Sequence, residues 1–341
     1  SPRRNCPVPE TITITGIGFA TDASLNTVVL SSGAEGTVLA ATPTSLTVTF
    51  DVKPQTAGAL TAVVTTNGIA SVAPVTVATI APVVTPVTDT QAANADTVTI
   101  TGLGFDPIAA NNLVVFNRGA SGTVTEATET SLTVTFTVKP TSVGVLTASV
   151  TTNGVPSGAG IQIATVVPVV TSSIATHAIS ADTIVINGFG FDSVASNNIV
   201  TFNRGAVGTV TNATATTLIV SFTVKPTSVG ELTASVTTNT RSSGDAVAVG
   251  SVVPVVTLTT ASLAANAPSI TINGFGFDTT PVNNVVTFSS GATGTVSAAT
   301  STTLTVDLTS EPTAGDLTAV VLVNGISIGA PVKVATTTPV V

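Results

Sequence analysis

The sequence predicts an all-β fold made of four β-sandwich domains in tandem. Apolar residues make up 43% of the 341, and they occur as short stretches of Val, Ile, Leu and Ala interrupted by Thr. Such β-branched residues favour the pleated surface of a sheet, and no segment shows the sustained periodicity of an amphipathic helix. The third observation is an internal repeat, which sets the number of domains.

The repeat is 86 residues long and fills the chain four times. It is marked by a Gly-x-Gly-Phe motif and by a turn proline; the first motif glycines are Gly16, Gly102, Gly188 and Gly274, and the prolines are Pro54, Pro140, Pro226 and Pro312. The fourth copy lacks one residue at 312–315, in a turn where a deletion leaves the flanking strands in register. The predicted domains are 1–80, 81–166, 167–252 and 253–338, with a tail at 339–341.

Repeat 2 illustrates how the strands are assigned. In chain order they are expected at 82–85, 97–102, 112–117, 122–127, 131–138, 146–154 and 161–165. Alternation of apolar with polar residues predicts which side chains face the core: Val98, Ile100, Leu132, Val134, Phe136, Val138, Leu146, Ala148 and Val150. Short alternating strands with regular turn signals between them are typical of a β-sandwich. A unit of this length buries a core of its own, so each repeat is expected to be a domain.

These motifs resemble the IPT/TIG domain found in plexins, some transcription factors and many bacterial surface proteins. The resemblance covers all four repeats and depends mainly on Gly-x-Gly-Phe, followed by Asn-x-Val-x-Phe, Ser-Leu-Thr-Val and a Gly-x-Leu strand that ends on Asn-Gly. It implies an immunoglobulin-like early-set sandwich, repeated in a linear array of the bacterial surface-protein type. The family has no catalytic residues to carry over, and its DNA-binding members require a basic surface.

Composition argues against several classes of function. The formal net charge is −8 and the nine Lys and Arg residues are scattered, whereas nucleic-acid binding needs clustered basic residues. The longest apolar stretch, about eight residues, is far short of the ~20 that span a bilayer. We therefore expect no nucleic-acid partner and no membrane insertion. The absence of Trp and Tyr disfavours an aromatic glycan platform, although contact with a glycan or cell surface stays open.

Localisation outside the cell or at its surface is expected from the Thr-rich, Lys-poor and Met-free composition. The first ten residues, SPRRNCPVPE, contain no apolar signal segment. Either such a segment has been removed, or the chain is a piece of a longer protein. No enzyme is expected, because His177 is the only histidine and has no nucleophile or carboxylate pair beside it in the sequence.

Three aspartates are weak candidates for a calcium site, and no other metal site or cofactor is expected. Asp106, Asp192 and Asp278 each follow the motif Phe and precede an Asn-Asn pair. Calcium takes about six to eight oxygen ligands, usually including several carboxylates. Repeat 1 has Ala20 at this position, so turns stabilised by the Asp side chain are the favoured interpretation.

Several other polar residues have ordinary explanations. Lys53, Lys139 and Lys225 precede the turn prolines and are expected to be solvated, although an intramolecular Lys–Asn crosslink is the alternative. Arg118 and Arg204 occur only in the middle repeats, which are either the most recent duplicates, the favoured interpretation, or differ from the end repeats because they have neighbours on both sides. The Gly-x-Gly pairs are expected to permit close approach of strands, because a dinucleotide fingerprint needs a third glycine and a helix.

The two ends of the sequence predict head-to-tail self-association. Pro-Val-Val precedes the first motif glycine by 20 residues in repeats 2 to 4. Repeat 1 has an unlike sequence there, which includes Cys6, whereas Pro339, Val340 and Val341 repeat the segment with no domain after them. We expect this tail to add as a strand to repeat 1 of the next copy, which builds an open polymer.

Two questions about this interface stay open in the sequence. The Cys6 thiol is expected to be either free or linked to another copy. The alternative to a polymer is a stiff spacer segment of a larger surface adhesin or secreted enzyme, cut at a domain edge.

Overall fold

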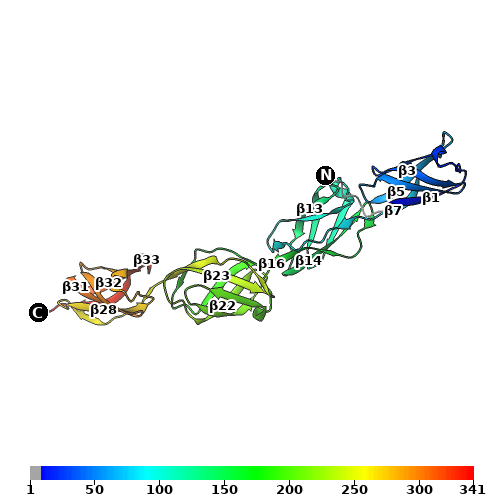
Figure 1. The fold of residues 1–341 in the computed structure, drawn as a ribbon. Helices are drawn as coiled ribbons and strands as arrows, with labels where there is room; N and C mark the ends of the chain where they lie inside the picture. Colours follow the sequence, from blue (N-terminus) through cyan, green and yellow to red (C-terminus); the bar gives the residue numbers. More distant parts are fainter. Residues whose placement is uncertain (1–8) are drawn as a thin grey trace. The chain divides into compact units, whose positions relative to one another are not determined.

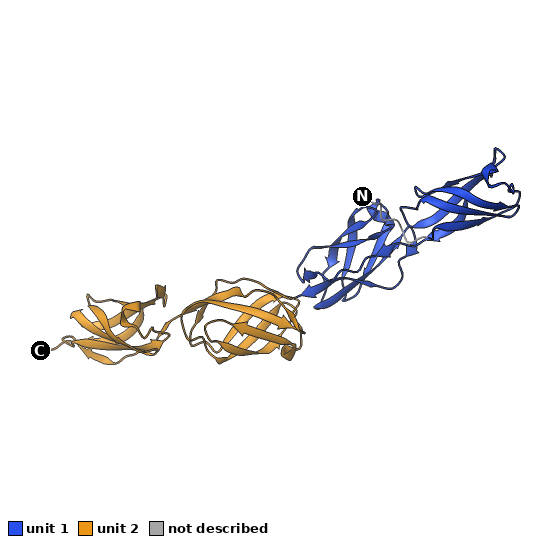
Figure 2. Ribbon diagram, in the orientation of Figure 1, with its two compact units in different colours: residues 1–167 blue, residues 168–341 orange. Residues whose placement is uncertain are grey.

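The computed structural model describes residues 9–341, and within that range it contains strands and short 3₁₀ turns but no α-helix (Figure 1). The all-β prediction is therefore confirmed. The chain divides into two compact units, residues 1–167 and 168–341, which hold two repeats each (Figure 2). The units are described separately below.

Repeat 2 is a sandwich of two sheets. Its strands are β8 (Val83–Val84), β9 (Thr90–Ala92), β10 (Thr97–Leu103), β11 (Asn112–Phe116), β12 (Ser121–Ala127), β13 (Ser131–Val138), β14 (Gly144–Thr152), β15 (Val155–Pro156) and β16 (Ile161–Val167). One sheet has the order β12-β13-β10-β8, and the other has the order β11-β14-β16-β9 with β15 paired to β14. Every pairing is antiparallel except the parallel one between β9 and β16.

Repeats 3 and 4 have the same two sheets. Repeat 3 contains β17 (Val169–Val170), β18 (Thr176–Ala178), β19 (Thr183–Phe189), β20 (Asn198–Phe202), β21 (Val207–Ala213), β22 (Thr217–Val224), β23 (Gly230–Thr238), β24 (Arg241–Ser242) and β25 (Val247–Val253). Repeat 4 contains β26 (Val255–Val256), β27 (Ser262–Ala264), β28 (Ser269–Phe275), β29 (Asn284–Phe288), β30 (Thr293–Ala299), β31 (Thr303–Ser310), β32 (Gly315–Val323), β33 (Ile326–Ser327) and β34 (Val332–Thr338). Strand order and register match repeat 2, which confirms the tandem immunoglobulin-like sandwiches.

The core of repeat 2 follows the predicted alternation with one exception. Val98, Ile100, Leu132 and Leu146 are buried, as are the other predicted core residues apart from Val138. Val138 is 49% exposed. A β-bulge explains the error: Ser121 pairs with Val138 whereas the next residue, Gly122, pairs with Phe136. The extra residue in β13 breaks the alternation at its end.

Repeat 1 has fewer strands than the other three. It contains β1 (Thr11–Thr15), β2 (Asn26–Leu30), β3 (Glu35–Thr42), β4 (Ser45–Val52), β5 (Gly58–Thr66), β6 (Ile69–Ala70) and β7 (Val75–Ile80). One sheet has the order β1-β4-β3, and in the other β5 pairs with β2, β6 and β7. Within residues 9–80 no strand corresponds to β8 or β9, so β1 is an open edge.

Consecutive repeats inside each unit pack through the second motif glycine. In the first unit the Ala57 N–H of repeat 1 donates to the Gly104 carbonyl at 2.8 Å, and Asn153 Nδ2 donates to the Ala57 carbonyl at 2.9 Å. In the second unit a Cβ on Gly276 would come within 2.8 Å of Ile179 Cδ1 of repeat 3. Glycine is needed here because the neighbouring repeat approaches the backbone closely.

Candidate functional site

The Pro-Val-Val segments form a short edge strand that closes the sandwich in repeats 2 to 4. In repeat 2, Val84 pairs with Gly102 and Val83 pairs with Leu103. The Thr85 N–H extends the ladder by donating to the Thr101 carbonyl at 2.8 Å. Val84 is only 4% exposed, because it lies between the two sheets and packs against β14. Val170 and Val256 are buried in the same way.

The first motif glycine permits this strand to approach. A Cβ on Gly102 would collide with the Val83 carbonyl oxygen and with the Phe105 ring. The corresponding collisions recur at the equivalent glycines of repeats 3 and 4, which are Gly188 and Gly274. The sequence predicts close approach of strands at these glycines, and the structure identifies the Pro-Val-Val segment as the strand that approaches.

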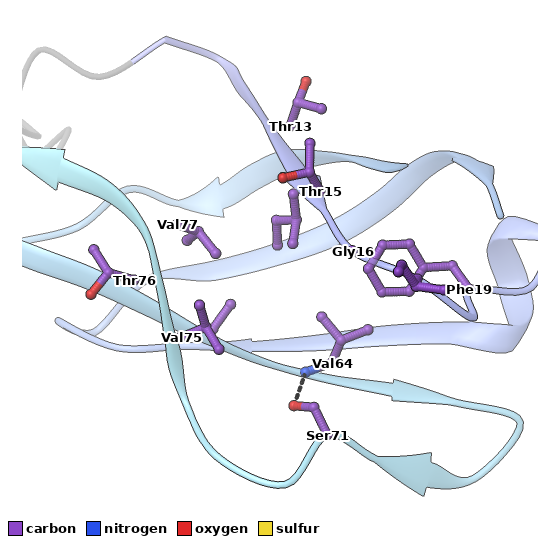
Figure 3. Close-up of a pocket in the computed structure, with 12 residues that line it drawn as sticks. Thr13, Thr15, Gly16, Phe19, Val64, Ser71, Val75, Thr76 and Val77 are labelled. Atoms are coloured by element: carbon purple, nitrogen blue, oxygen red, sulfur yellow. Dashed lines mark hydrogen bonds between the residues drawn. The ribbon is translucent and has the colours of Figure 1, made fainter. Parts of the chain in front are cut away.

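Repeat 1 has an open groove at the same place (Figure 3). The groove has a volume of about 330 Å³ and lies between β1 on one side and β5 and β7 on the other. Gly16, Phe19, Val64, Val75 and Val77 supply much of its lining (Figure 3). The surface is therefore largely apolar.

Burial differs between repeat 1 and the others at these lining positions. Phe19, Val64 and Val77 are only partly buried. Their equivalents in repeat 2, taken 86 residues later, are Phe105, Val150 and Ile163, and these are at most 3% exposed. Ile17, on the rim, is 93% exposed. Repeat 1 thus leaves uncovered the core surface that the Pro-Val-Val strand covers in the other repeats.

The tail predicted to enter such a groove follows directly after the last strand. Strand β34 ends at Thr338, and Pro339, Val340 and Val341 have no strand assignment. The side chains of Val340 and Val341 are both exposed in the single chain. Cys6, the fourth predicted interface residue, lies outside the described residues.

The three aspartates proposed as weak calcium ligands accept hydrogen bonds from their own loop and from the Asn of a second turn. Asp192 accepts hydrogen bonds from the Val194 N–H at 2.8 Å and from Asn239 Nδ2 at 2.7 Å, and Asp278 has equivalent partners in Thr280 and Asn324. These bonds, with the amide of Asn239 contributing most, lower the pKa of Asp192 below its ordinary value of 3.8.

Asp106 has the same role, with one difference in its electrostatics. Burial acts to raise the pKa of Asp106, but hydrogen bonds from the Ile108 N–H, Asn153 and Asn111 outweigh it and the pKa is lowered. Among residues 9–341 no group of three His, Cys, Asp or Glu side chains is placed to hold a metal ion. The aspartates therefore brace the loop that joins their motif to the next strand.

A buried asparagine in the same loop was not singled out by the sequence. The side chain of Asn112 is 6% exposed; its Nδ2 donates to the carbonyls of Asp106 and Ile108, and its Oδ1 accepts from the Asp106 N–H and the Thr152 hydroxyl. Buried asparagines occupy the same position in the other repeats, at Asn26, Asn198 and Asn284. The signal was present: this second Asn of each pair persists in repeat 1, where the first is replaced by Leu25.

The lysines before the turn prolines remain partly exposed, as predicted, and each also forms an ion pair that the sequence did not predict. Lys139 Nζ lies 2.8 Å from Asp96 Oδ1, and Lys53 and Lys225 pair with Glu10 and Asp182. Lys139 directly follows the end of β13, and Asp96 directly precedes the start of β10. Because β10 and β13 are antiparallel neighbours, the two side chains lie within reach of each other, and the other two pairs are placed in the same way. The pKa of Asp96 is lowered by its hydrogen bond to Lys139 and by the attraction of the charge.

Arg118 and Arg204 brace the turn after the proline. Arg118 Nε donates to the Val145 carbonyl at 2.7 Å, and its Nη1 bonds to Ser142 and Val143. Arg204 makes the equivalent contacts in repeat 3. His177 lies on β18, in the parallel pairing with β25, and packs over Gly250. These side chains belong to the scaffold of their repeats.

No helix in residues 9–341 is long and apolar enough to cross a membrane. No protein-family model matches the sequence, and no curated protein matches it. Among the solved structures that match is invasin, a bacterial integrin-binding protein, with 13% identity and a TM-score of 0.25 over 95% of this chain and 78% of invasin. The Escherichia coli adhesin FdeC matches with 14% identity and a TM-score of 0.22 over 95% of this chain and 99% of FdeC. The extracellular region of plexin A4 also matches, with 13% identity and a TM-score of 0.22 over 94% of this chain and 28% of the plexin chain.

The chain spans less than half of the first two matching structures, which are both plexin A4: 28% of one and 48% of the other. At these identities and TM-scores the matches carry no argument about function. The immunoglobulin-like architecture stands on the strand order and register of the repeats themselves.

Proposed function

We propose that this chain is a non-enzymatic structural protein located outside the cell or on its surface. Its copies assemble head-to-tail into a filament or surface layer, and its repeats belong to the IPT/TIG type found in bacterial surface proteins. The all-β tandem architecture, the scarcity of charge and the scaffold roles of the candidate polar residues support a structural role.

One observation carries the proposal of head-to-tail assembly. Among its described residues, 9–80, repeat 1 has an open sheet edge and an apolar groove where repeats 2 to 4 hold a Pro-Val-Val strand. A further Pro-Val-Val segment lies exposed at 339–341. The two ends are complementary but different surfaces, and such a heterologous contact generates an open chain of subunits instead of a closed dimer.

The strand alone is too small to hold two subunits together. Burying one valine as Val84 is buried contributes about 2 kcal/mol, which is less than the cost of bringing two proteins together. Repeat 4 of one copy and repeat 1 of the next copy must therefore also contact each other outside this strand. Gly18 supports such a contact: it corresponds to Gly104 and Gly276, where the preceding repeat packs, yet no described atom lies within 4 Å of the position of an added Cβ.

Electron microscopy of the purified chain tests the proposal. Filaments are expected from the full chain, and a chain with residues 339–341 deleted is expected to stay as separate subunits. The deletion must not extend further, because Thr336 and Thr337 pair with β27 and β32 in the sheet of repeat 4. Filaments that form equally well without the tail contradict the proposal.

The second candidate function is a stiff spacer within a larger surface adhesin or secreted enzyme. The direct hydrogen bonds between repeats 1 and 2 favour it, because they restrict bending inside that unit. Sedimentation separates the two functions, since a spacer stays monomeric at all concentrations.

A further inference from the structure

We infer that the groove of repeat 1 is an acceptor site for one strand, and that residues 339–341 of a second copy fill it in a fixed register. Val341 lies opposite Gly16 and Val340 lies opposite Ile17. The inference rests on the proposed head-to-tail assembly and specifies the contact that makes it.

The groove is lined by residues equivalent to those that the Pro-Val-Val strand covers in repeats 2 to 4. Its lining residues Phe19, Val64 and Val77 have buried equivalents in repeats 2 to 4, where an edge strand covers them. Apolar side chains at these positions are costly to leave in water. The groove is therefore a site from which one strand is missing among residues 9–80.

Gly16 fixes where the missing strand lies. At Gly102, Gly188 and Gly274 the carbonyl oxygen of the first valine occupies the space that a Cβ would fill. At Gly16 the three described atoms nearest to that space all belong to the ring of Phe19, which is present in all four repeats as the motif Phe. A backbone carbonyl can thus approach Gly16 as it approaches the other three glycines.

The occupant is identified by what fills the site elsewhere in the chain. In repeats 2 and 4 the filling valines follow the last strand of the preceding repeat almost at once: β7 ends at Ile80 before Val83, and β25 ends at Val253 before Val255. Strand β34 ends at Thr338 before Val340 in the same manner. The segment 339–341 therefore follows the last strand of its repeat by the same kind of short link as the segments that fill the sites in repeats 2 and 4.

The same connection places the donor repeat correctly. When the Pro-Val-Val strand of repeat 2 is seated, repeat 1 packs on Gly104, two residues after Gly102. A tail seated opposite Gly16 brings repeat 4 of the donor toward Gly18. That glycine has open space around it in the described residues.

The alternation of the strand assigns different roles to the two valines. Val84, Val170 and Val256 are buried between the sheets, whereas the preceding valines Val83, Val169 and Val255 are only partly buried. Val341 takes the buried position and Val340 the outer one. A charged side chain at position 341 is therefore expected to prevent docking, because none of the described residues that line the groove is charged and could pair with it.

Disulfide capture between two singly labelled chains tests the register. Both chains carry Cys6→Ser; one has Ile17→Cys, and the other has Val340→Cys. Residues directly opposite in an antiparallel pair have Cβ atoms close enough to form a disulfide. Mixing the two under mild oxidation should give at least about tenfold more mixed dimer than the control, in which Leu39→Cys replaces Ile17→Cys.

The control residue is also an exposed large apolar residue of repeat 1, but it lies elsewhere. Leu39 is 66% exposed and lies on β3, at the opposite edge of the same sheet from β1. Adding Val341→Asp to the Val340→Cys chain should reduce capture to the control level. Capture no greater than the control overturns the inference, and this is also the result expected if residues 1–8 of the same chain fill the groove.

The outcomes separate this inference from the proposed function. Filaments in the microscope without capture at Ile17→Cys mean that assembly uses another contact, and the strand site is wrong. Specific capture without filaments means that the site is correct and that head-to-tail polymerisation is wrong. Disulfide formation within one chain carrying both substitutions, but not between mixed chains, overturns the assignment of a second copy as the occupant.

Discussion

Replacing Asn112 with Ala should destabilise repeat 2 by about 3–5 kcal/mol. The change removes four hydrogen bonds: two donated by Nδ2 at 2.8 and 3.2 Å, and two accepted by Oδ1 at 3.1 and 2.9 Å. Each bond contributes about 1 kcal/mol net. One of these four bonds comes from the Thr152 hydroxyl, which is fully buried and loses this partner, so the total is expected toward the upper end of the range.

The neighbouring Asn111 is the matched control for this change. It is exposed, and its side chain makes one hydrogen bond, to Asp106 Oδ2 at 3.1 Å. Asn111→Ala should therefore cost about 0.5 kcal/mol, as most surface substitutions do. The two variants differ by one position in the sequence and remove the same chemical group, so burial and the number of hydrogen bonds distinguish them.

Hydrogen exchange followed by mass spectrometry measures the effect in the intact chain. Amide exchange in β11 and β14 should accelerate by a factor of about 100 to 4,000 in Asn112→Ala, because about 1.4 kcal/mol corresponds to a factor of ten. Repeats 3 and 4 serve as internal references in the same sample. Equal protection of repeat 2 in the two variants would refute the assignment of Asn112 as the main brace of the loop.

Three further predictions concern modularity, pH and the thiol. A fragment of residues 81–166 should fold alone as a monomeric sandwich, and a random-coil circular-dichroism spectrum would contradict the proposed boundaries. The lowered pKa of Asp192 contributes stability that is present above its ordinary value of 3.8 and is lost as pH falls through the lower folded value; Asp192→Asn should flatten that acid dependence in denaturation curves, with unchanged curves counting against it. Cys6→Ser should leave assembly intact, and a dimer band on non-reducing gels that disappears together with assembly would show that the thiol is required.

The period-two alternation predicts most of the fold because burial is local in a strand. Val98, Leu132 and Leu146 are placed on the core side by their neighbours alone, and the structure confirms them. Two strands of repeat 2 escape this logic. The segment at Thr90–Ala92 has no apolar alternation and pairs with β16, about 75 residues away, and Val155–Pro156 is a two-residue return on β14.

The candidate sites are less predictable because they depend on contacts between neighbouring strands that are far apart in the sequence. Nothing adjacent to Lys139 in the sequence indicates its pairing with Asp96, which is brought near by strand order. The inward orientation of Asn112 likewise depends on Thr152 of β14, the neighbouring strand in the same sheet. The repeated Pro-Val-Val segment at 339–341 is visible in the sequence, but the groove of repeat 1 is a property of the paired sheets.

The parallel pairing of β9 with β16 determines how a repeat bears tension. The first of these strands lies near the start of its repeat and the second at its end, so a pull along the chain drags them in opposite directions along their common axis. The hydrogen bonds from Thr165 to Asp89 and from Ala93 to Val167 are then loaded together and cannot be opened one after another. Repeats 3 and 4 contain the same arrangement in β18–β25 and β27–β34. The three repeats that contain this pair of parallel strands are therefore expected to resist stretching until these hydrogen bonds break together.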